Sequence, residues 1–345
     1  MSSEAQTSWE DAVLEAFREA ARNGAKLSVR GQGGRMLELL PEVRILEASH
    51  ADVKVATHPE DLVATADAGL TLSALNEALA KHRQWIPFLA ADGHDDTLGG
   101  AIAAGVDTTF RGYGAFHERV LGMRVLTPGF GAVEVGAKVV KNVAGYNLPR
   151  LFFATRGRLG VISQVTLKVS PVPALRRTWV REGALEEMAL AAEACLFEAH
   201  PWAEIRLEKL GNDTPVRVAA AWHGIPETIA HLESRLGPSL VSPGTPAIAS
   251  ASNGLTVLSG GVPRRTMLEL IERWSGGPIT MEWQSGSFFG LLPRETAQDM
   301  MSWIREHAGG VRLLSGPAWE APRPPALEDT WVRLKGFYDP KGVLV

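Results

Sequence analysis

The sequence contains a single cysteine, Cys195, among 345 residues. One cysteine cannot form an internal disulfide, a thiolate metal cluster or the ligand set of an iron–sulfur centre. The sequence also lacks an apolar run of the roughly 20 residues that a membrane-spanning helix needs. The polar, acidic start of the chain lacks the basic and apolar regions of a signal peptide. These absences favour a cytoplasmic protein, attached to a membrane only through partners.

No strong excess of charge is present either, because 35 basic residues stand against 39 acidic ones. A nucleic-acid partner is therefore not expected. Most histidines are scattered without the spacing of metal ligands. Residues 92–96 concentrate possible metal ligands, but a solvated Asp/Gly turn explains them better, so no metal site is expected. A nucleophile motif is missing too, since Gln284–Ser287 lacks the leading glycine of Gly-x-Ser-x-Gly.

The length favours two domains, and the 45% apolar and 21% charged residues are typical of ordered ones. Up to Pro173, where we expect the first domain to end, helix and strand patterns alternate with glycine-rich segments. Ser8 is the expected N-cap of the first helix, and Thr71 of the second. Helices are expected at 9–22 and 71–82, and strands at 25–30, 43–47, 62–66, 120–127, 132–135 and 161–169, with a Pro-Gly hairpin turn at 128–129.

Beyond Pro173 the pattern of strand, helix, strand, strand, helix occurs twice, separated by a Pro/Ser/Gly-rich bridge at 237–253. This pattern predicts one antiparallel sheet with helices on one face. Eight of the ten tryptophans lie in this part; we expect sheet packing for most, and a flavin- or substrate-facing role remains open for one or two. Cys195 is expected to be buried. The strands are expected at 178–180, 203–208, 216–222, 255–258, 279–283, 287–292 and 311–314, and the helices at 185–199, 226–236, 264–274 and 295–307.

The 35 glycines among 345 residues are a larger share than the usual ~7%, and many of them gather in three segments. The first, 31–36, follows a strand and can turn several amides into one concavity for a phosphate. It is not a Rossmann fingerprint, since Met36 occupies the third glycine position, nor a Walker motif. A phosphate loop and a simple tight turn both remain open for it. The second segment, 97–105, consists almost entirely of small residues, and the third runs from 138 to 160.

These three segments, followed by a strand that ends in Lys168-Val169-Ser170-Pro171, resemble those of FAD-binding oxidoreductases of the vanillyl-alcohol oxidase, or PCMH-type, class. Within that class the E subunits of bacterial glycolate oxidases are most similar. The resemblance covers 27–173 and the C-terminal stretch 334–343. It implies an α+β fold, with a two-part FAD-binding domain at 1–173, an antiparallel cap domain at 174–320, and a C-terminal segment at 321–345 that returns to the first domain as a strand.

The resemblance also implies which residues would contact FAD. The first loop would wrap the diphosphate, the second segment would continue this cradle, and backbone amides would neutralise most of its charge. Residues 159–162 would pass near the adenosine. The expected cofactor-binding residues are Arg30, Gly31, Gln32, Gly33, Gly34, Arg35, Met36, Thr97, Leu98, Gly99, Gly100, Gly105, Lys141, Gly145, Tyr146, Gly157, Gly160, Val161 and Ile162.

Four departures from the family pattern bear on FAD binding. Arg35 replaces a Thr or Ser, Asn147 replaces an Asp, Thr155-Arg156 replaces Gly-Ser, and the last motif stops at Val345. The first loop contains no histidine, and the one cysteine lies in the second domain, so FAD is expected to bind without a covalent bond.

Two functions follow as hypotheses. The first is an FAD-dependent 2-hydroxy acid oxidoreductase subunit that acts on glycolate or a similar acid, beside a larger flavin subunit and an iron–sulfur subunit. The alternative is a non-catalytic assembly or electron-relay subunit that keeps the FAD fold. A flavin reductase of cell-wall precursor synthesis is a weaker third possibility. No catalytic residue can be named from the sequence.

Overall fold

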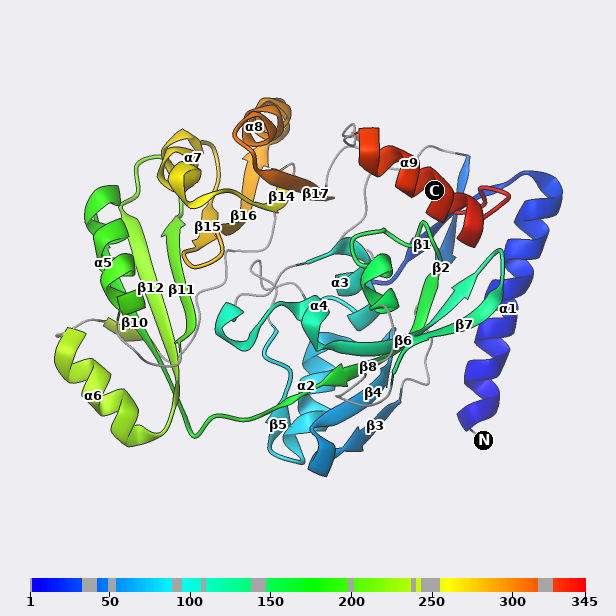
Figure 1. The fold of residues 1–345 in the computed structure, drawn as a ribbon, viewed down its shortest axis with the longest axis horizontal. Helices are drawn as coiled ribbons and strands as arrows, with labels where there is room; N and C mark the ends of the chain where they lie inside the picture. Colours follow the sequence, from blue (N-terminus) through cyan, green and yellow to red (C-terminus); the bar gives the residue numbers. More distant parts are fainter. Residues whose placement is uncertain are drawn as a thin grey trace.

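The computed structural model describes residues 2–32, 42–48, 54–88, 95–106, 110–137, 147–197, 202–236, 240–242, 255–315 and 325–345. Two sheets dominate the architecture (Figure 1). A five-stranded sheet lies in the part of the chain before Pro173, and an eight-stranded sheet lies beyond it. This arrangement confirms the α+β class and the antiparallel second sheet.

The first part is built around the five-stranded sheet, whose order is β3-β4-β8-β6-β7. Its core is filled by apolar side chains of the strands and of α2 and α3, and the small pair β1–β2 is parallel. The elements are α1 Ser2–Asn23, β1 Lys26–Arg30, β2 Val43–Glu47, β3 Val55–His58, β4 Val63–Asp67, α2 Leu72–Ala80, β5 Gln84–Trp85, α3 Leu98–Ala104, α4 Phe116–Arg119, β6 Val120–Thr127, β7 Gly131–Gly136, β8 Val161–Lys168 and β9 Ser170–Pro171, with 3-10 turns η1 Pro59–Asp61, η2 Arg111–Tyr113 and η3 Leu148–Phe152.

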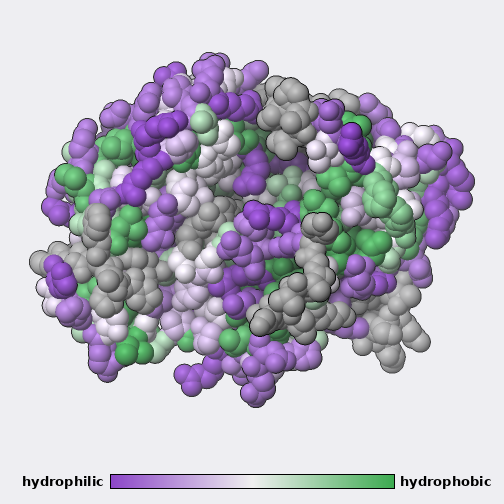
Figure 2. Space-filling view, viewed as in Figure 1, coloured by the Kyte–Doolittle hydropathy of each residue, from purple (hydrophilic) through white to green (hydrophobic). Residues whose placement is uncertain are grey.

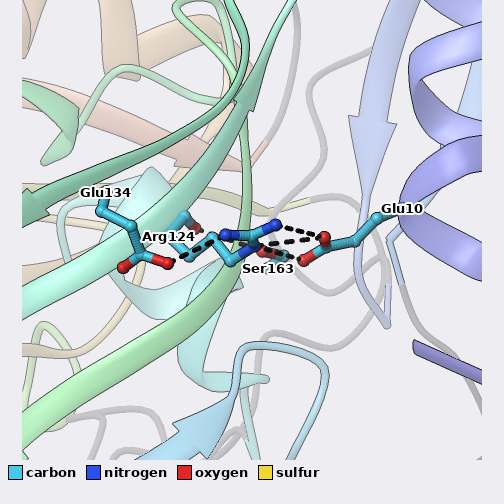
Figure 3. Close-up of polar contacts among 4 residues, drawn as sticks. All are labelled: Glu10, Arg124, Glu134 and Ser163. Carbon is cyan, nitrogen blue, oxygen red and sulfur yellow. Dashed lines mark hydrogen bonds and ion pairs between the residues drawn. The ribbon is translucent and has the colours of Figure 1, made fainter. Parts of the chain in front are cut away.

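The first helix, α1, is anchored on this sheet by a buried carboxylate (Figure 3). Arg124 of β6 donates to both oxygens of Glu10, with Nε at 3.0 and 3.1 Å, and its Nη1 donates to Glu134 of β7 at 2.9 Å. The helix begins at Ser2, so the prediction that Ser8 is its N-cap was wrong. The sequence before Trp9 is mostly polar and has no apolar periodicity, so the sequence pattern could not predict that the helix begins this early.

The second sheet has the order β13-β10-β12-β11-β15-β16-β14-β17, and every pairing in it is antiparallel. The strand–helix pattern occurs twice, as predicted, and the two halves meet where β11 pairs with β15. The elements are β10 Leu175–Gly183, α5 Leu185–Phe197, β11 Trp202–Lys209, β12 Val216–Gly224, α6 Pro226–Leu236, β13 Leu240–Ser242, β14 Leu255–Gly261, α7 Met267–Arg273 after the 3-10 turn η4 Arg264–Thr266, β15 Ile279–Glu282, β16 Ser287–Pro293, α8 Arg294–Glu306 and β17 Gly310–Ser315.

The helices of this part cover one face of its sheet (Figure 1). Their apolar residues share a core with Ile205, Leu207 and Trp222, and Cys195 is fully buried there as predicted. Figure 2 shows largely hydrophilic side chains on the outer surfaces of α8 and α1. The opposite face of the sheet points toward the first part of the chain.

The C-terminal segment contains a helix, α9 Pro325–Tyr338, rather than the expected strand. Within the described residues 325–345, only the final residues pair with a strand: Leu344 forms a parallel bridge with Leu27 of β1, and Val345 N donates to the Leu27 carbonyl at 2.9 Å. Tyr338 is part of the core of the first sheet. The segment thus lies against β1, which leads into the first glycine segment.

Candidate functional site

The first glycine segment begins where β1 ends. Gly31 and Gln32 form a bend after Arg30, and the expected site residues Gly33, Gly34, Arg35 and Met36 lie outside the described residues. The Arg30 side chain pairs with Glu47 at the end of β2, and Nε donates at 3.2 Å. Because this guanidinium is already paired with Glu47, the simplest contact from Arg30 to a bound anion is through its backbone.

The second segment forms α3, a short helix that sequence patterns did not predict because small residues give it no clear apolar face. Thr97 is its N-cap and accepts a hydrogen bond from Gly100 N at 3.1 Å. A Cβ on Gly31 would lie 2.6 Å from Thr97 Oγ1, and a Cβ on Gly99 would lie 2.9 Å from the Ala68 Cβ. Glycine is therefore required at both positions for close approach of the chain.

The amides of this helix start are already used inside the chain. Leu98 N donates to the Leu70 carbonyl, Gly99 N to Ala68, and Ala101 N to Thr97, all at 2.8 Å. The Gly100 amide is bound by the Thr97 cap. The four amides at this turn therefore already have partners within the chain, and the part of the turn in a diphosphate cradle stays a prediction. The glycines of the turn let the neighbouring segments pack closely.

The third segment meets the other end of α3. Ala154 N donates to the Ile102 carbonyl at 3.0 Å, and Arg156 N donates to Ala103 at 2.8 Å. Gly105 has a φ of +69°, and a Cβ there would lie 2.5 Å from the Ala154 Cβ. Gly157, with a φ of +76°, approaches Val29 of β1 so closely that a Cβ would lie 2.9 Å from its Cγ2. This segment thus joins α3 to β1.

Three of the expected residues in this region lie further along the chain. Gly160 approaches the Leu126 carbonyl, where a Cβ would lie at 2.7 Å, and Val161 and Ile162 open β8 with buried side chains. These two side chains belong to apolar cores, so only their backbone can face a ligand. The structure does not describe the remaining expected residues, Lys141, Gly145 and Tyr146.

The described parts of the three segments therefore converge, although they are far apart in the sequence. Gly31 touches the start of α3, Gly105 lies at its end, and Gly157 returns to β1. A cofactor with a long, narrow diphosphate fits such a place, because glycine allows backbone to approach it from several sides. The sequence shows the three glycine-rich segments, and the structure shows that their described parts lie close together.

The C-terminal segment braces the same region. Lys335 Nζ donates to the Arg158 carbonyl, the Leu344 carbonyl and Asp339 Oδ2, each at 2.6 Å. Asp339 is 2% exposed and also accepts from Val343 N and Leu344 N at 2.8 Å. Burial lowers the pKa of Lys335, and its bond to Asp339 opposes that shift. The third segment is thus tied to the end of the chain.

A second polar site, which the sequence did not reveal, joins the two parts of the molecule. Tyr113 of η2 lies with its hydroxyl 3.0 Å from His223 Nδ1 of β12. Trp85 and Phe110 lie against the same imidazole with ring centroids at 5.6 and 5.3 Å, and the guanidinium of Arg176 lies 4.0 Å from the Trp85 ring. These residues are up to 138 positions apart (Trp85 to His223), and no local pattern in the sequence connects them.

The electrostatics of this junction favour a neutral imidazole. Burial, assisted by the positive charge of Arg176, lowers the pKa of His223 to about 4. Burial likewise raises the pKa of Tyr113. Near neutral pH both the imidazole and the phenol are uncharged, so the hydrogen bond between them is an uncharged link between β12 and η2.

The Asp/Gly turn before α3 has a structural use where it is described. Asp95 accepts a hydrogen bond from Ser73 N at 2.9 Å, at the start of α2. Thr71 caps that helix as predicted and accepts from Ala74 N at 3.2 Å. Within the described part of the chain, no group of three or more His, Cys, Asp or Glu side chains could hold a metal ion.

Comparison with known proteins agrees with this geometry. Residues 5–136 match the family described as "FAD binding domain". The chain carries an FAD-binding domain of the PCMH type. This domain includes β1, α3 and the first two glycine segments described above.

The chain as a whole is similar to glycolate oxidase subunit GlcE of Escherichia coli, with 28% identity over 97% of this chain and 95% of the relative. Glycolate oxidase subunit GlcD of Bacillus subtilis is 28% identical over 39% of this chain but only 29% of its own length. Among solved structures, alkyldihydroxyacetonephosphate synthase matches 96% of this chain and 74% of its own with a TM-score of 0.68 at 14% identity, which supports the fold. The chain is thus similar over nearly its whole length to a glycolate oxidase subunit, and its first part matches an FAD-binding domain.

Proposed function

We propose that this chain is the FAD-binding subunit of an oxidoreductase complex that oxidises glycolate or a closely similar 2-hydroxy acid. The similarity to subunit GlcE over nearly the whole of both chains is the observation that carries the proposal. A GlcD-like flavin subunit and an iron–sulfur subunit are the proposed partners, since the single cysteine leaves an iron–sulfur cluster to another chain. Among the described residues, no helix has the length and apolar character needed to cross a membrane.

FAD is proposed to bind without a covalent bond at the convergent glycine segments. The loop that starts at Gly31 would supply backbone amides to the diphosphate, since the first-turn amides of α3 are occupied. The backbone at 159–162 would pass the adenosine. Bound FAD supplies the acceptor for the two electrons removed from the acid. The residues of this chain would hold the cofactor in place.

We also propose a division of the chain into an FAD-binding domain at 1–173, a cap domain at 174–320 and a returning segment at 321–345. The change of sheet between β9 and β10 supports the first boundary. The hydrogen bond from Lys335 Nζ to the Arg158 carbonyl supports the return of the last segment.

An electron-relay role without substrate chemistry is the alternative. The low pKa of His223 favours it, because an imidazole that stays neutral down to about pH 4 is a weak base for removing a hydroxyl proton. The two functions differ in whether glycolate alone reduces the flavin of the isolated chain.

The test is to purify the chain alone and with its candidate partner subunits, saturate each sample with FAD, remove free cofactor and record visible spectra before and after adding glycolate. A flavin band that bleaches in the isolated chain supports substrate oxidation there. Bleaching only in the complex supports the relay. Acid precipitation of the loaded chain should release the flavin into the supernatant, whereas flavin that stays in the pellet contradicts non-covalent binding.

A further inference from the structure

Two phenylalanine side chains are exposed where α9 ends beside the β6–β7 hairpin. Phe337 of α9 is 59% exposed and Phe130 of the hairpin turn is 51% exposed, although their rings are in contact with centroids 4.5 Å apart. Val332, earlier on α9, is also 59% exposed. Figure 2 shows hydrophobic surface in this region of the molecule. We call Phe130, Val332 and Phe337 the α9 apolar patch.

The patch lies outside the buried face of α9. Trp331, Leu334 and Tyr338 pack against the core of the first sheet, and they recur with the spacing of one helix face. Val332 and Phe337 lie outside that face and stay exposed. The helix is therefore apolar on two faces, of which one packs within the chain and the other is open to solvent.

The backbone that carries the two phenylalanines is held in place. Gly129 N donates to the Tyr338 carbonyl at 2.9 Å, and a Cβ on Gly129 would lie 2.8 Å from the Phe337 carbonyl oxygen. Tyr338 is 8% exposed and contacts Phe152 with ring centroids 5.3 Å apart. This backbone is therefore fixed before another surface covers the rings, which lowers the cost of ordering on binding.

A glycine lies inside α9 although no contact within the chain requires it. A Cβ on Gly336 would meet no atom of the described chain within 4 Å, and its backbone is not left-handed. Glycine destabilises a helix relative to alanine, because its unfolded backbone has more freedom to lose. Gly336 follows Val332 by one helical turn and directly precedes Phe337. The space over this glycine is thus open to a group from outside the chain.

We propose that the α9 apolar patch is the surface on which a partner flavin subunit docks, with an apolar side chain of that subunit over Gly336. The proposal rests on the proposed function, which places this chain in a complex. Exposed apolar side chains on a fixed backbone are typical of protein–protein contacts, where a few aromatic residues supply most of the affinity. GlcE and GlcD, two relatives of this chain, are both named as subunits of glycolate oxidase.

The charges beside the patch favour a different subunit over a second copy of this chain. Arg333 lies next to the patch on α9, and Lys341 follows Pro340 at the hairpin. Both are exposed, and neither forms an ion pair in the part of the chain that the structure describes. The exposed Asp329 lies further away, about two turns before Phe337. A two-fold contact centred on the phenylalanines would bring like charges together, whereas a partner with carboxylates around an apolar pocket would neutralise them.

An anionic membrane is the other surface that aromatic and basic residues can bind. Sequences that bind acidic lipids usually cluster about 4–8 Lys or Arg residues, and Arg333 and Lys341 are only two. Lipid chains adapt to any shape, so an open glycine gives no advantage there. A protein surface has a fixed shape and gains from the space over Gly336.

The experiment measures the Kd between the full chain, saturated with FAD, and a purified GlcD-like flavin subunit of the same organism by isothermal titration calorimetry. Phe337→Ala should weaken binding by about tenfold or more, as expected for an aromatic residue at the centre of a contact. Gly336→Gln should weaken it similarly because its side chain fills the open space. The isolated G336Q chain should unfold at the wild-type temperature or above, since glutamine favours a helix more than glycine. Leu190→Ala, at a 71% exposed leucine on α5, is the control and should bind like wild type.

Wild-type affinity in both F337A and G336Q would overturn the docking surface and leave the proposed complex intact. No binding of the wild-type chain to the flavin subunit would overturn the proposed partner together with the surface assigned to it. A loss of bound FAD in F337A along with the loss of the partner would overturn the assignment, because the effect would then lie in the fold. So would a wild-type dimer, or binding to vesicles of phosphatidylglycerol, that F337A abolishes while its affinity for the subunit is unchanged.

Discussion

Glycine at position 31 lies where a single methyl group would change the cofactor site. A Cβ there would lie 2.6 Å from Thr97 Oγ1, the atom that caps α3. The hydroxyl would have to rotate away and lose its bond to Gly100, which costs about 1 kcal/mol. The loop and the helix would then separate at the point where they converge.

Gly31→Ala should weaken FAD binding by about tenfold or more, because a loss of about 1.4 kcal/mol corresponds to a tenfold change. Equilibrium dialysis against FAD measures it. Gly224→Ala is the matched control, since a Cβ at that position has open space around it. Equal affinities for the two variants would show that the glycine at 31 has no part in the site.

His223 is the residue whose ionisation links stability to acid pH. Its folded-state pKa of about 4 lies below the usual 6.5, so unfolding takes up a proton between these values. The stability that neutral His223 contributes is fully present above pH 6.5 and is lost as the pH falls through 4. Glu204 of β11, which is buried beside Arg206, acts with the opposite sign, because its raised pKa removes stability as the pH rises toward 8.

His223→Gln should therefore flatten the pH dependence of the free energy of unfolding between pH 4 and pH 6.5. Denaturant unfolding at several pH values in this range measures the slope. His58→Gln is a control at an exposed histidine. A slope in H223Q as steep as that of wild type would contradict a neutral, buried imidazole.

At the scale of single elements, α1 and α9 are held to the FAD-binding domain by buried acidic residues. Glu10 fixes α1 to Arg124, and Asp339 accepts three hydrogen bonds at the end of α9. In both cases the carboxylate is buried and its cation is partly exposed. The two helices lie on the same side of the molecule in Figure 1.

Asp339→Ala should lower the free energy of unfolding by about 3 kcal/mol, at the lower end of the range for a broken buried ion pair because Lys335 is partly exposed. Chemical denaturation measures the change. Asp329→Ala, at an exposed position on the same helix, should change it by less than about 0.5 kcal/mol. Similar losses in both variants would show that the loss reflects the helix rather than the buried carboxylate.

Glu10→Gln should cost about 1.5–3 kcal/mol, the range for hydrogen bonds to charged groups. Glu134→Gln should cost much less, because this second partner of Arg124 is 56% exposed. The same denaturation assay compares the two. An equal cost for both would mean that burial of Glu10 does not determine its contribution.

The sequence predicted most elements of the second sheet because apolar periodicity is strong there, and α6 begins and ends at the predicted residues. It missed α3, whose small residues carry no periodic apolar face, and β5, which is only two residues long. It also missed α9, for which a strand was expected. The family resemblance indicated the glycine segments, but which amides remain available depends on hydrogen bonds such as Gly99 to Ala68, which only the fold reveals.

For the whole molecule, the junction between the two sheets is the part that sequence could not predict. The link from Tyr113 to His223 and the buried ion pair of Arg206 with Glu204 both depend on which strand faces are opposed. Both lie on the sheet face that points to the FAD-binding domain. The proposed FAD binding therefore depends on the glycine segments. The pH dependence expected of the chain depends on the buried polar groups at this junction.

The central claim is that this chain binds FAD on its own fold, and a titration of the purified, cofactor-free chain with FAD tests it most directly. Flavin fluorescence or equilibrium dialysis gives the affinity and the number of sites. The account predicts one FAD per chain, released by acid, with weaker binding in Gly31→Ala and unchanged binding in Gly224→Ala. A correctly folded chain that binds no FAD would contradict it.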